Sequence, residues 1–467
     1  MKMWAGRFRQ PLDSEFANWQ RSFSFDWRLL AHELAASLVH ARALKESGIL
    51  SSEELAKILQ GLEQIASRAE NSPGFRDDDE AEDVHHFVEK QLVNLIGDTG
   101  YKLHSGRSRN EQIATDLRLY VRDSIDKIQL LLANWLDVTL SRADKAGGAA
   151  MPAYTHLQRA EPVLVAHWLL AYVEMFLRDY DRFSDCRKRV NLCPLGSGAV
   201  AGASVSLDRE MMAAELGFSG PTPNSVDATS DRDFVLEFVN DLSILALHLS
   251  RWAEEMILFS TPEFGFINSP DKYSTGSSAL PQKKNPDLVE LTRAKSARIM
   301  GAATTLFVTV KGLPLAYNKD LQETQEPLFD STETALSLLP LLTGWMKEMK
   351  FDYVRMQSSV QSGFMNALAG ATYLVHRGVP FRMAHEQIGK AVQECLEKGC
   401  ELQDLSLEEL RQFNPLFDQD FYSALTLESV LSVHDVSGGT APVQVKQAIA
   451  EAKHRVALLR GEVHAHA

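Results

Sequence analysis

The sequence predicts an all-α protein with three domains arranged around a central bundle of long helices. Apolar residues recur with the helical period over several unbroken stretches, each longer than the usual helix of about 10–14 residues. Alternating runs of β-branched residues, which would indicate strands, are scarce. With 467 residues, 45% of them hydrophobic and 24% charged, the chain can bury a large core without disulfides or metals.

The long helical stretches define the central domain. The period predicts helices over 115–145, 162–190, 230–260, 286–311 and 326–349, the last continuing through Pro340. Pro162 is expected at the first helical position, Ser230 as an N-cap with Asp233 three residues later, and Asn285 as a cap before Pro286. These helices are apolar over much of their circumference, so we expect other helices, including those of further subunits, to cover them.

The predicted domain boundaries follow the change in helix length. Residues 1–110 are interrupted by loops at 71–80 and 97–109 and predict a helical N-terminal domain. Residues 111–355 predict the long-helix bundle, and residues 356–467 a small helical C-terminal domain. In this last part Gly363, Gly370, Gly378 and Gly399 separate shorter helices.

Composition narrows the range of partners and compartments. A net charge of −14 argues against nucleic acid as a partner, although a local basic cluster can still bind a small anion. The four cysteines at 186, 193, 395 and 400 lack zinc-site spacing, so we expect reduced, mostly buried thiols in a cytoplasmic protein. We predict neither a signal peptide nor a membrane span, because no sufficiently long apolar run exists.

Short polar segments, here called polar islands, interrupt the predicted helices. Each of them has a functional interpretation and an ordinary structural one. SGRSRNEQ (105–112) places Arg107, Arg109 and Asn110 together, either as a carboxylate clamp or as a helix start with solvated cations. YTHLQRAEP (154–162) puts His156 in a loop before a helix, where it is either a titrating group or a loop hydrogen-bonding residue. LPLAYNKDLQETQEP (313–327) is either a binding segment or an ordinary connector.

Two further segments restrict the chemistry. The glycines of PLGSGAVAGAS (194–204) follow a helix end rather than a strand, so a dinucleotide-binding fold is rejected in favour of close backbone packing or a substrate-facing turn. The acidic run 77–83 lacks calcium-loop spacing and is interpreted as a solvated helix start. Phosphate-loop, zinc-protease and serine-hydrolase motifs are absent from the sequence.

TGSSALPQKKNPD (275–287) is the most informative island. Its glycine and prolines predict a flexible loop, and a helix follows this loop. The free N–H groups at the start of that helix, together with Lys283 and Lys284, favour binding of an anion. The same positive charge would lower the pKa of a nearby hydroxyl. A solvated surface loop is the alternative. The stretch closely resembles the GSSxMPxKxNP signature of the fumarase/aspartase superfamily, with Leu280 in place of the usual methionine.

Within that superfamily the chain resembles the argininosuccinate lyase family over essentially its whole length. The stretches that carry the resemblance are MWAGRF (3–8), SGRSRNEQ, YTHLQRAEP, LPLAYNKDLQE, ATSDRDFVLEF and GGTAP. The resemblance implies a homotetramer with a twenty-helix central bundle and active sites built from three subunits. It also implies reversible anti elimination of argininosuccinate to arginine and fumarate, the last step of arginine biosynthesis, without a metal or organic cofactor.

The resemblance also implies roles for individual residues. Ser277 matches the catalytic base, Lys283 the cation that stabilises its alkoxide, His156 the general acid or its activator, and Glu290 the carboxylate that pairs with the histidine. Thr155 matches a residue beside the acid that also binds substrate. The other substrate-binding matches are Ser22, Asp83, His85, Arg109, Asn110, Asn285, Tyr317, Gln322 and Gln325. The family usually has lysine where Gln325 stands, so this position lacks a charge.

Two other functions remain as alternatives. The first is a different reaction of the same superfamily, that of an adenylosuccinate lyase, a fumarase or an aspartase; LPLAYNKDLQE and MWAGRF argue against it. The second is a non-catalytic structural relative of the kind recruited as a lens protein. The presence of Ser277, His156, Lys283 and Glu290 argues against that alternative.

Overall fold

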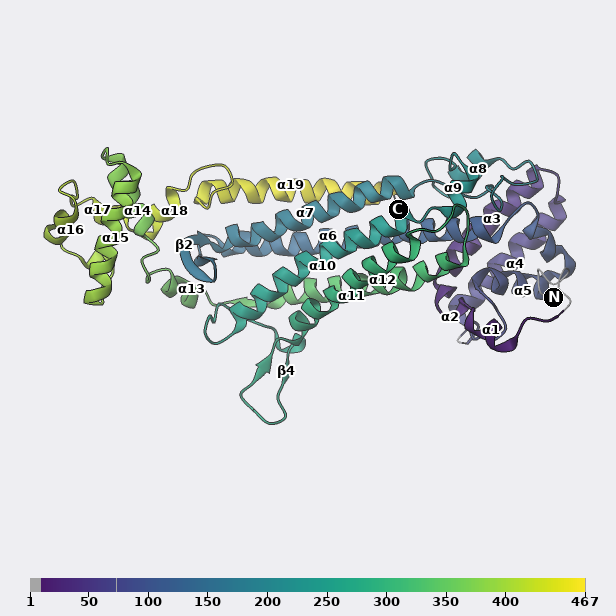
Figure 1. The fold of residues 1–467 in the computed structure, drawn as a ribbon, viewed down its shortest axis with the longest axis horizontal. Coiled ribbons are helices and arrows are strands. Elements are labelled where there is room, and N and C mark those ends of the chain that lie inside the picture. The colour runs from purple at the N-terminus through teal and green to yellow at the C-terminus, as the bar shows by residue number, and fades with distance from the viewer. Residues whose placement is uncertain (1–9, 73, 467) are drawn as a thin grey trace. The chain divides into compact units, whose positions relative to one another are not determined.

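The computed structural model describes residues 10–72 and 74–466, with side chains up to Arg460 (Figure 1). The MWAGRF stretch at 3–8 lies outside the described residues. The predicted all-α class is confirmed, because the strands of the described chain form only three short antiparallel pairs. No helix in the described part of the chain is long and apolar enough to cross a membrane.

The chain divides into two compact units, which are described separately. The first takes in the described residues up to Ile128, together with Asp181–Ala246 and Ala297–Ala335. The second takes in Gln129–Tyr180, Leu247–Ser296 and the described residues from Leu336 onward. The helices that contribute to both units are α6 (Arg109–Ala146), α7 (Val165–Val190), α10 (Asp233–Ser260), α11 (Asp287–Val310) and α12 (Gln325–Glu348).

Shorter helices complete the first unit. They are α1 (Ser14–Trp19), α2 (Phe23–Asp26), α3 (Leu30–Glu46), α4 (Ser52–Asn71), α5 (Val84–Ile96), α8 (Arg209–Glu215) and α9 (Ser225–Ser230), with 3₁₀ turns at Trp27–Leu29, Gly97–His104 and Lys319–Thr324. Helix α4 begins with a capping box between Ser51 and Glu54, which satisfies free backbone donors at its start. Asp83 caps α5 through the N–H of His86 at 2.8 Å, so the acidic run does precede a helix as expected. Asp83 itself, however, is buried and not solvated.

The second unit holds the strands and the C-terminal helices. Strands β1 (Ala150–Thr155) and β2 (Gln158–Leu164) pair, as do β3 (Ile267–Asn268) with β6 (Lys350–Phe351) and β4 (Thr275–Gly276) with β5 (Lys284–Asn285). The helices are α13 (Tyr353–Ser359), α14 (Ala367–His376), α15 (Phe381–Lys398), α16 (Leu407–Phe413), α17 (Phe421–Ala424), α18 (Leu427–Ser432) and α19 (Pro442–His466), with 3₁₀ turns at Asp271–Tyr273 and Leu402–Asp404.

Aromatic side chains pack the long helices of the second unit together. Trp135 of α6 contacts Phe176 of α7 with ring centroids 4.4 Å apart. Trp252 of α10 lies 6.3 Å from Trp135 and 5.3 Å from Trp345 of α12. All four rings are at most 1% exposed. Helix α19 runs beside the part of α7 that ends at Tyr180 (Figure 1), and the Tyr180 hydroxyl donates to the Leu459 carbonyl at 3.0 Å.

The long helices were predicted correctly, but three of their starts were wrong. Helix α6 begins at Arg109, six residues before the predicted start at 115. Pro162 lies in β2, paired with Pro152, and α7 begins only at Val165. Ser230 is the last residue of α9, and the cap of α10 is the Asp231 carboxylate, which accepts the N–H of Asp233 at 2.7 Å. Helix α11 starts at Asp287, close to the expected residue, but the Asn285 side chain does not cap it.

The glycine-rich segment 194–204 confirms the rejection of a dinucleotide fold. It follows α7 and leads into no βαβ unit among the described residues. Gly198 has φ +59°, and a Cβ there would lie 2.6 Å from the carbonyl oxygen of Gly202. Its N–H donates to the Glu111 carboxylate at 2.7 Å, which anchors the turn on α6. Close backbone packing is therefore the reason for glycine at this position.

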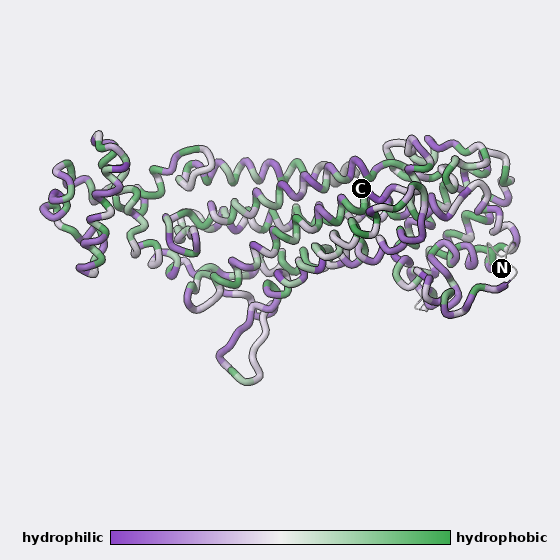
Figure 2. Tube along the Cα trace, in the orientation of Figure 1, coloured by the Kyte–Doolittle hydropathy of each residue, from purple (hydrophilic) through white to green (hydrophobic). Residues whose placement is uncertain are grey.

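Hydrophobic and hydrophilic residues are interleaved along the helices (Figure 2). Most apolar side chains face the interior, but several large ones on the long helices are exposed in this chain, namely Leu247, Leu291, Phe307, Val308 and Leu341. Three of the four cysteines are buried and none is in a disulfide, as predicted.

Candidate active site

The serine loop joins β4 to β5 in the second unit. Residues 278–284 are exposed, and the loop projects away from the adjacent helices (Figure 1). The Ser277 hydroxyl oxygen accepts the backbone N–H groups of Ala279 at 3.2 Å and Leu280 at 3.1 Å. Two N–H donors aimed at one oxygen stabilise negative charge on it, which is the condition that a serine base requires.

The two lysines of the loop have different surroundings. The Lys284 ammonium binds the Asp271 carboxylate at 2.6 Å, the Asn268 side chain at 3.1 Å and the Ser269 carbonyl. Lys284 therefore fastens the root of the loop. Lys283 is exposed, and its charge contributes to lowering the pKa of Asp287, after the hydrogen bond from Thr275. This difference favours Lys283 over Lys284 as the cation available to a reacting group.

Asn285 and Glu290 lie where the loop returns to α11. The Asn285 amide donates to the Gly276 carbonyl at 3.4 Å across the hairpin. Glu290 stands in the first turn of α11 and is exposed. The structure thus places Ser277, Lys283, Asn285 and Glu290 on one short segment.

His156 lies at the tip of the β1–β2 hairpin, with Thr155 beside it. Thr155 pairs with Gln158, so His156 and Leu157 form a two-residue turn, and their φ angles are +54° and +57°. Such turns normally contain Asn and Gly, since other residues are strained at positive φ. Thr155 and His156 are both exposed, and within the described chain His156 forms no hydrogen bond or ion pair with Ser277 or Glu290.

Replacing Leu157 by glycine is expected to stabilise the protein. Glycine adopts positive φ without strain, and the Leu157 side chain is 68% exposed, so little packing is lost. We expect the free energy of unfolding to rise by about 0.5–1 kcal/mol, measured by urea denaturation. Leu315→Gly, at an exposed loop residue without positive φ, is the control and should give no gain. Equal effects of the two variants would contradict the strain at the hairpin tip.

In the first unit, four predicted binding residues form one network. The Ser22 hydroxyl donates to Asp26, and its backbone N–H donates to the Glu82 carbonyl at 2.9 Å. Asp83 follows directly and pairs with Arg109, while the Gln322 amide donates to the Gln20 carbonyl at 3.1 Å. Burial opposes ionisation of Asp83, yet Arg109 and His85 hold its pKa below the ordinary value. Asp83 is therefore a carboxylate at neutral pH.

Three other residues predicted to bind substrate also belong to the first unit. Asn110 follows Arg109 on α6, and its amide donates to the Ala199 carbonyl at 3.4 Å. Burial raises the pKa of Tyr317, opposed by the charge of Arg232; the charges of Asp83 and Arg109 also act on it. Gln325 opens α12 and is 2% exposed, and its Oε1 accepts no hydrogen bond from the described residues.

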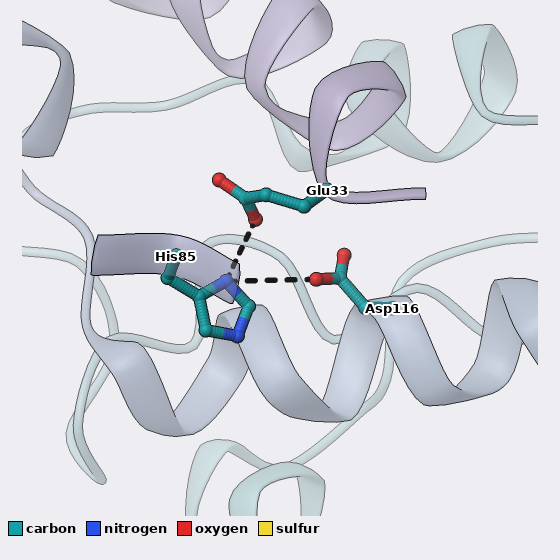
Figure 3. Close-up of side chains that lie close together, drawn as sticks. All are labelled: Glu33, His85 and Asp116. Atoms are coloured by element: carbon teal, nitrogen blue, oxygen red, sulfur yellow. Dashed lines mark hydrogen bonds and ion pairs between the residues drawn. The ribbon is translucent and has the colours of Figure 1, made fainter. Parts of the chain in front are cut away.

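His85 faces a different set of groups. Figure 3 shows its ring between Glu33 of α3 and Asp116 of α6. Nδ1 lies 3.0 Å from Glu33 and 3.6 Å from Asp116, and the His85 side chain is 2% exposed. Burial raises the pKa of Glu33, but Arg107 and His85 outweigh it and keep the pKa below its ordinary value. Burial and the Glu33 charge raise the pKa of Asp116 well above its ordinary value. Of the two acids, Glu33 is therefore the one that ionises more readily.

The atoms of Glu33, His85 and Asp116 are close enough to hold a metal ion, as are those of Cys186, Glu237 and Asp241. Around Glu33, however, the protein already supplies a cation, since the Arg107 guanidinium lies 3.5 Å from its carboxylate. The amide of Gln112 also donates to Glu33 at 3.1 Å. Arg107 and Arg109 therefore both pair with carboxylates of the chain itself. These ion pairs favour a structural role for the two arginines over the predicted clamp for a substrate carboxylate.

Sequence reasoning missed Asp26, Glu33 and Asp116. All three lie in helices and are at most 3% exposed. Their signal in the sequence is a charged residue at a position where the helical period calls for an apolar one. That signal marks a buried acid but does not identify its partner.

The comparisons with known proteins agree with this fold. The family described as "Lyase" matches residues 6–301, and that described as "Argininosuccinate lyase C-terminal" matches residues 364–432. The solved structure of an EDDS lyase in complex with formate has a TM-score of 0.86 at 25% identity and covers 98% of this chain and 93% of its own. A class II fumarase from Schistosoma mansoni shares the fold, with a TM-score of 0.74 at 17% identity, covering 86% of this chain and 90% of its own.

This helical fold and its serine loop define a lyase of the fumarase/aspartase superfamily. An argininosuccinate lyase from Koribacter versatilis is 58% identical over 463 residues, which are 99% of each chain. One from Acidobacterium capsulatum is 58% identical over 460 residues, covering 97% of this chain and 94% of its own. The chain belongs to the argininosuccinate lyase family.

Proposed function

We propose that this protein catalyses the reversible cleavage of argininosuccinate to arginine and fumarate. The observation that carries the proposal is the 58% identity to argininosuccinate lyases over almost the whole chain. The reaction removes a proton from the carbon beside a carboxylate and expels the guanidino nitrogen from the neighbouring carbon. Negative charge builds up on that carboxylate, so the site must supply fixed donors and cations.

Ser277 is the proposed base. Its oxygen already accepts two backbone N–H groups, which lowers the cost of forming an alkoxide. Closure of the exposed loop over the substrate would bring Lys283 near the same charge and exclude water, which strengthens both interactions. Asn285, on the returning strand, is proposed to hold a substrate carboxylate.

His156 is the proposed acid or activator of the acid, oriented by Glu290. Because these two residues form no hydrogen bond or ion pair with each other within the described chain, we propose that the pair forms between protomers of a homotetramer. The exposed apolar side chains of α10, α11 and α12 support such an assembly, since they need partners to cover them. The division into three domains, with boundaries after residues 110 and 355, also remains a prediction.

The remaining substrate contacts are proposed for the residues around Ser22. Hydrogen bonds and an ion pair hold Ser22, Asp83, Arg109 and Gln322 in place, which suits recognition of one substrate shape. Asn110, Tyr317 and Thr155 are proposed to complete the contacts. His85 and Gln325, which are also buried, are proposed as further contributors to the same substrate site.

A substrate panel tests the proposed reaction. Argininosuccinate, adenylosuccinate, malate and aspartate are each supplied to the purified protein, and fumarate is followed by its ultraviolet absorbance. We expect turnover of argininosuccinate alone. Turnover of adenylosuccinate without argininosuccinate would overturn the proposal. A well-folded tetramer inactive on all four substrates would indicate a structural relative.

Replacing Gln325 by lysine is expected to lower KM for argininosuccinate and to reduce stability. The variant restores the charge that is usual in the family, but it places an ammonium in a buried first turn of α12. A cation at a helix N-terminus is unfavourable, so we expect the free energy of unfolding to fall by about 1 kcal/mol. Steady-state kinetics and thermal melting measure the two effects. An unchanged or higher KM would show that another cation already supplies the charge.

A further inference from the structure

Asp26, the last residue of α2, lies directly behind Ser22 and ties it to α5. Its Oδ2 accepts the Ser22 hydroxyl hydrogen at 2.6 Å, and its Oδ1 accepts the N–H of Val84 at 3.0 Å. Asp26 is 3% exposed and Ser22 is 4% exposed. Because the Val84 donor belongs to the backbone, Oδ1 has a fixed role and only Oδ2 can exchange its hydrogen-bonding role with Ser22.

The charges around Asp26 determine where its proton resides. Asp83 at the start of α5 and Arg109 at the start of α6 face it, and Asp116 of α6 also lies within range of its charge. Burial and the Asp83 carboxylate raise the pKa of Asp26 to about 7, against the hydrogen bonds of Ser22 and Val84 and the charge of Arg109. Arg109 pairs with Asp83. Of the two neighbouring acids, Asp26 is therefore the one that takes up a proton first.

We propose that Asp26 is a positioning residue that directs the Ser22 hydroxyl hydrogen inward and so makes Ser22 an acceptor for a cationic nitrogen of the substrate. This inference rests on the proposed function, in which Ser22 contacts argininosuccinate. Ionised Asp26 takes the Ser22 hydrogen, which leaves only oxygen lone pairs for a ligand. An ammonium or guanidinium N–H satisfies those lone pairs, whereas a carboxylate is repelled.

Protonation of Asp26 reverses this arrangement. The new hydrogen resides on Oδ2 and is donated to the Ser22 oxygen, so the Ser22 hydrogen turns outward. Ser22 then presents a donor, and the match to a cationic nitrogen is lost. We therefore expect KM for argininosuccinate to fall as the pH rises through about 7, where Asp26 loses its proton.

Asp26→Asn fixes the reversed arrangement with little change of shape. The amide oxygen still accepts from Val84, and the amide nitrogen donates to Ser22. We expect KM for argininosuccinate and the inhibition constant of arginine to rise by about tenfold, with kcat little changed. Inhibition by succinate, which has no nitrogen, should stay the same. The fall of KM near pH 7 should disappear.

Matched variants separate this role from a general loss of structure. Asp185→Asn, at an exposed aspartate, should behave as the wild type. In a Ser22→Ala background, Asp26→Asn should have no further effect on arginine inhibition. Should Asp26→Asn not fold, Ser22→Ala alone is expected to abolish the pH dependence of KM near 7.

Three results would overturn the inference. These are an unchanged arginine inhibition constant in Asp26→Asn, equal weakening of arginine and succinate inhibition, or a pH dependence that survives Ser22→Ala. Failure of the proposed function is distinguishable, because the wild-type protein would then release no fumarate from argininosuccinate.

Discussion

Replacing Ser277 by alanine is expected to lower kcat by about 10²–10⁴-fold, the usual contribution of a positioned acid or base. The variant removes the oxygen that accepts the N–H groups of Ala279 and Leu280, and with it the proposed base. KM should change little, because the proposed binding groups are on other residues. Stopped-time assays of fumarate release measure the loss, and calorimetric titration with argininosuccinate measures binding to the inactive protein.

Ser278 provides the matched control for this experiment. It is the adjacent serine, exposed on the same loop, and its hydroxyl makes no hydrogen bond to the described residues. Ser278→Ala should therefore retain nearly full activity. Near-normal turnover of Ser277→Ala, or a larger loss in Ser278→Ala, would remove Ser277 from the role of base and shift attention to another group on the loop.

The largest expected loss of stability comes from Trp252→Ala. Trp252 is fully buried on α10 between Trp135 of α6 and Trp345 of α12, so truncation leaves a cavity at the centre of the second unit. Trp-to-Ala changes in cores cost about 3–5 kcal/mol, the sum of lost transfer energy and the unfilled cavity. Denaturant unfolding at one fixed protein concentration measures the change, since assembly adds to apparent stability.

Trp19→Ala is the control for this second experiment. Trp19 is 83% exposed, and its described ring contact is with Phe16, at 6.2 Å between centroids. Its removal should alter the free energy of unfolding by no more than about 0.5 kcal/mol. Similar effects of the two substitutions would contradict the central place of the aromatic cluster.

Helix positions were predictable from the sequence because long apolar stripes leave little choice of secondary structure. The β1–β2 hairpin was not, since its turn is His156-Leu157 rather than a glycine- or asparagine-containing pair. Pro162 was expected at a helix start because proline is common at the first helical position, but it lies in β2, paired with Pro152. Local preference was overridden here by the packing of the hairpin.

The candidate site also contains residues that the sequence predicted and residues that it did not. The serine loop and the residues quoted with it were predicted from a specific motif, and their roles remain proposals. Asp26 was not predicted, because its significance depends on Ser22 and Val84, which meet it only after folding. Glu33 is a partner of His85 and Arg107 only because α3 packs against α5 and the segment before α6. Contacts between buried charges depend on three-dimensional neighbours, which a single sequence does not specify.

The attachment of Lys284 limits how far the serine loop can travel. Because this ammonium is bound to Asp271 and Ser269, bending is confined to the seven residues 277–283 between the paired strands. Half of such a segment, fully extended, spans about 12 Å. The loop is therefore a short segment that bends from Ser277 onward, so the Ser277 oxygen, the proposed base, lies near the pivot and moves less than the tip of the loop.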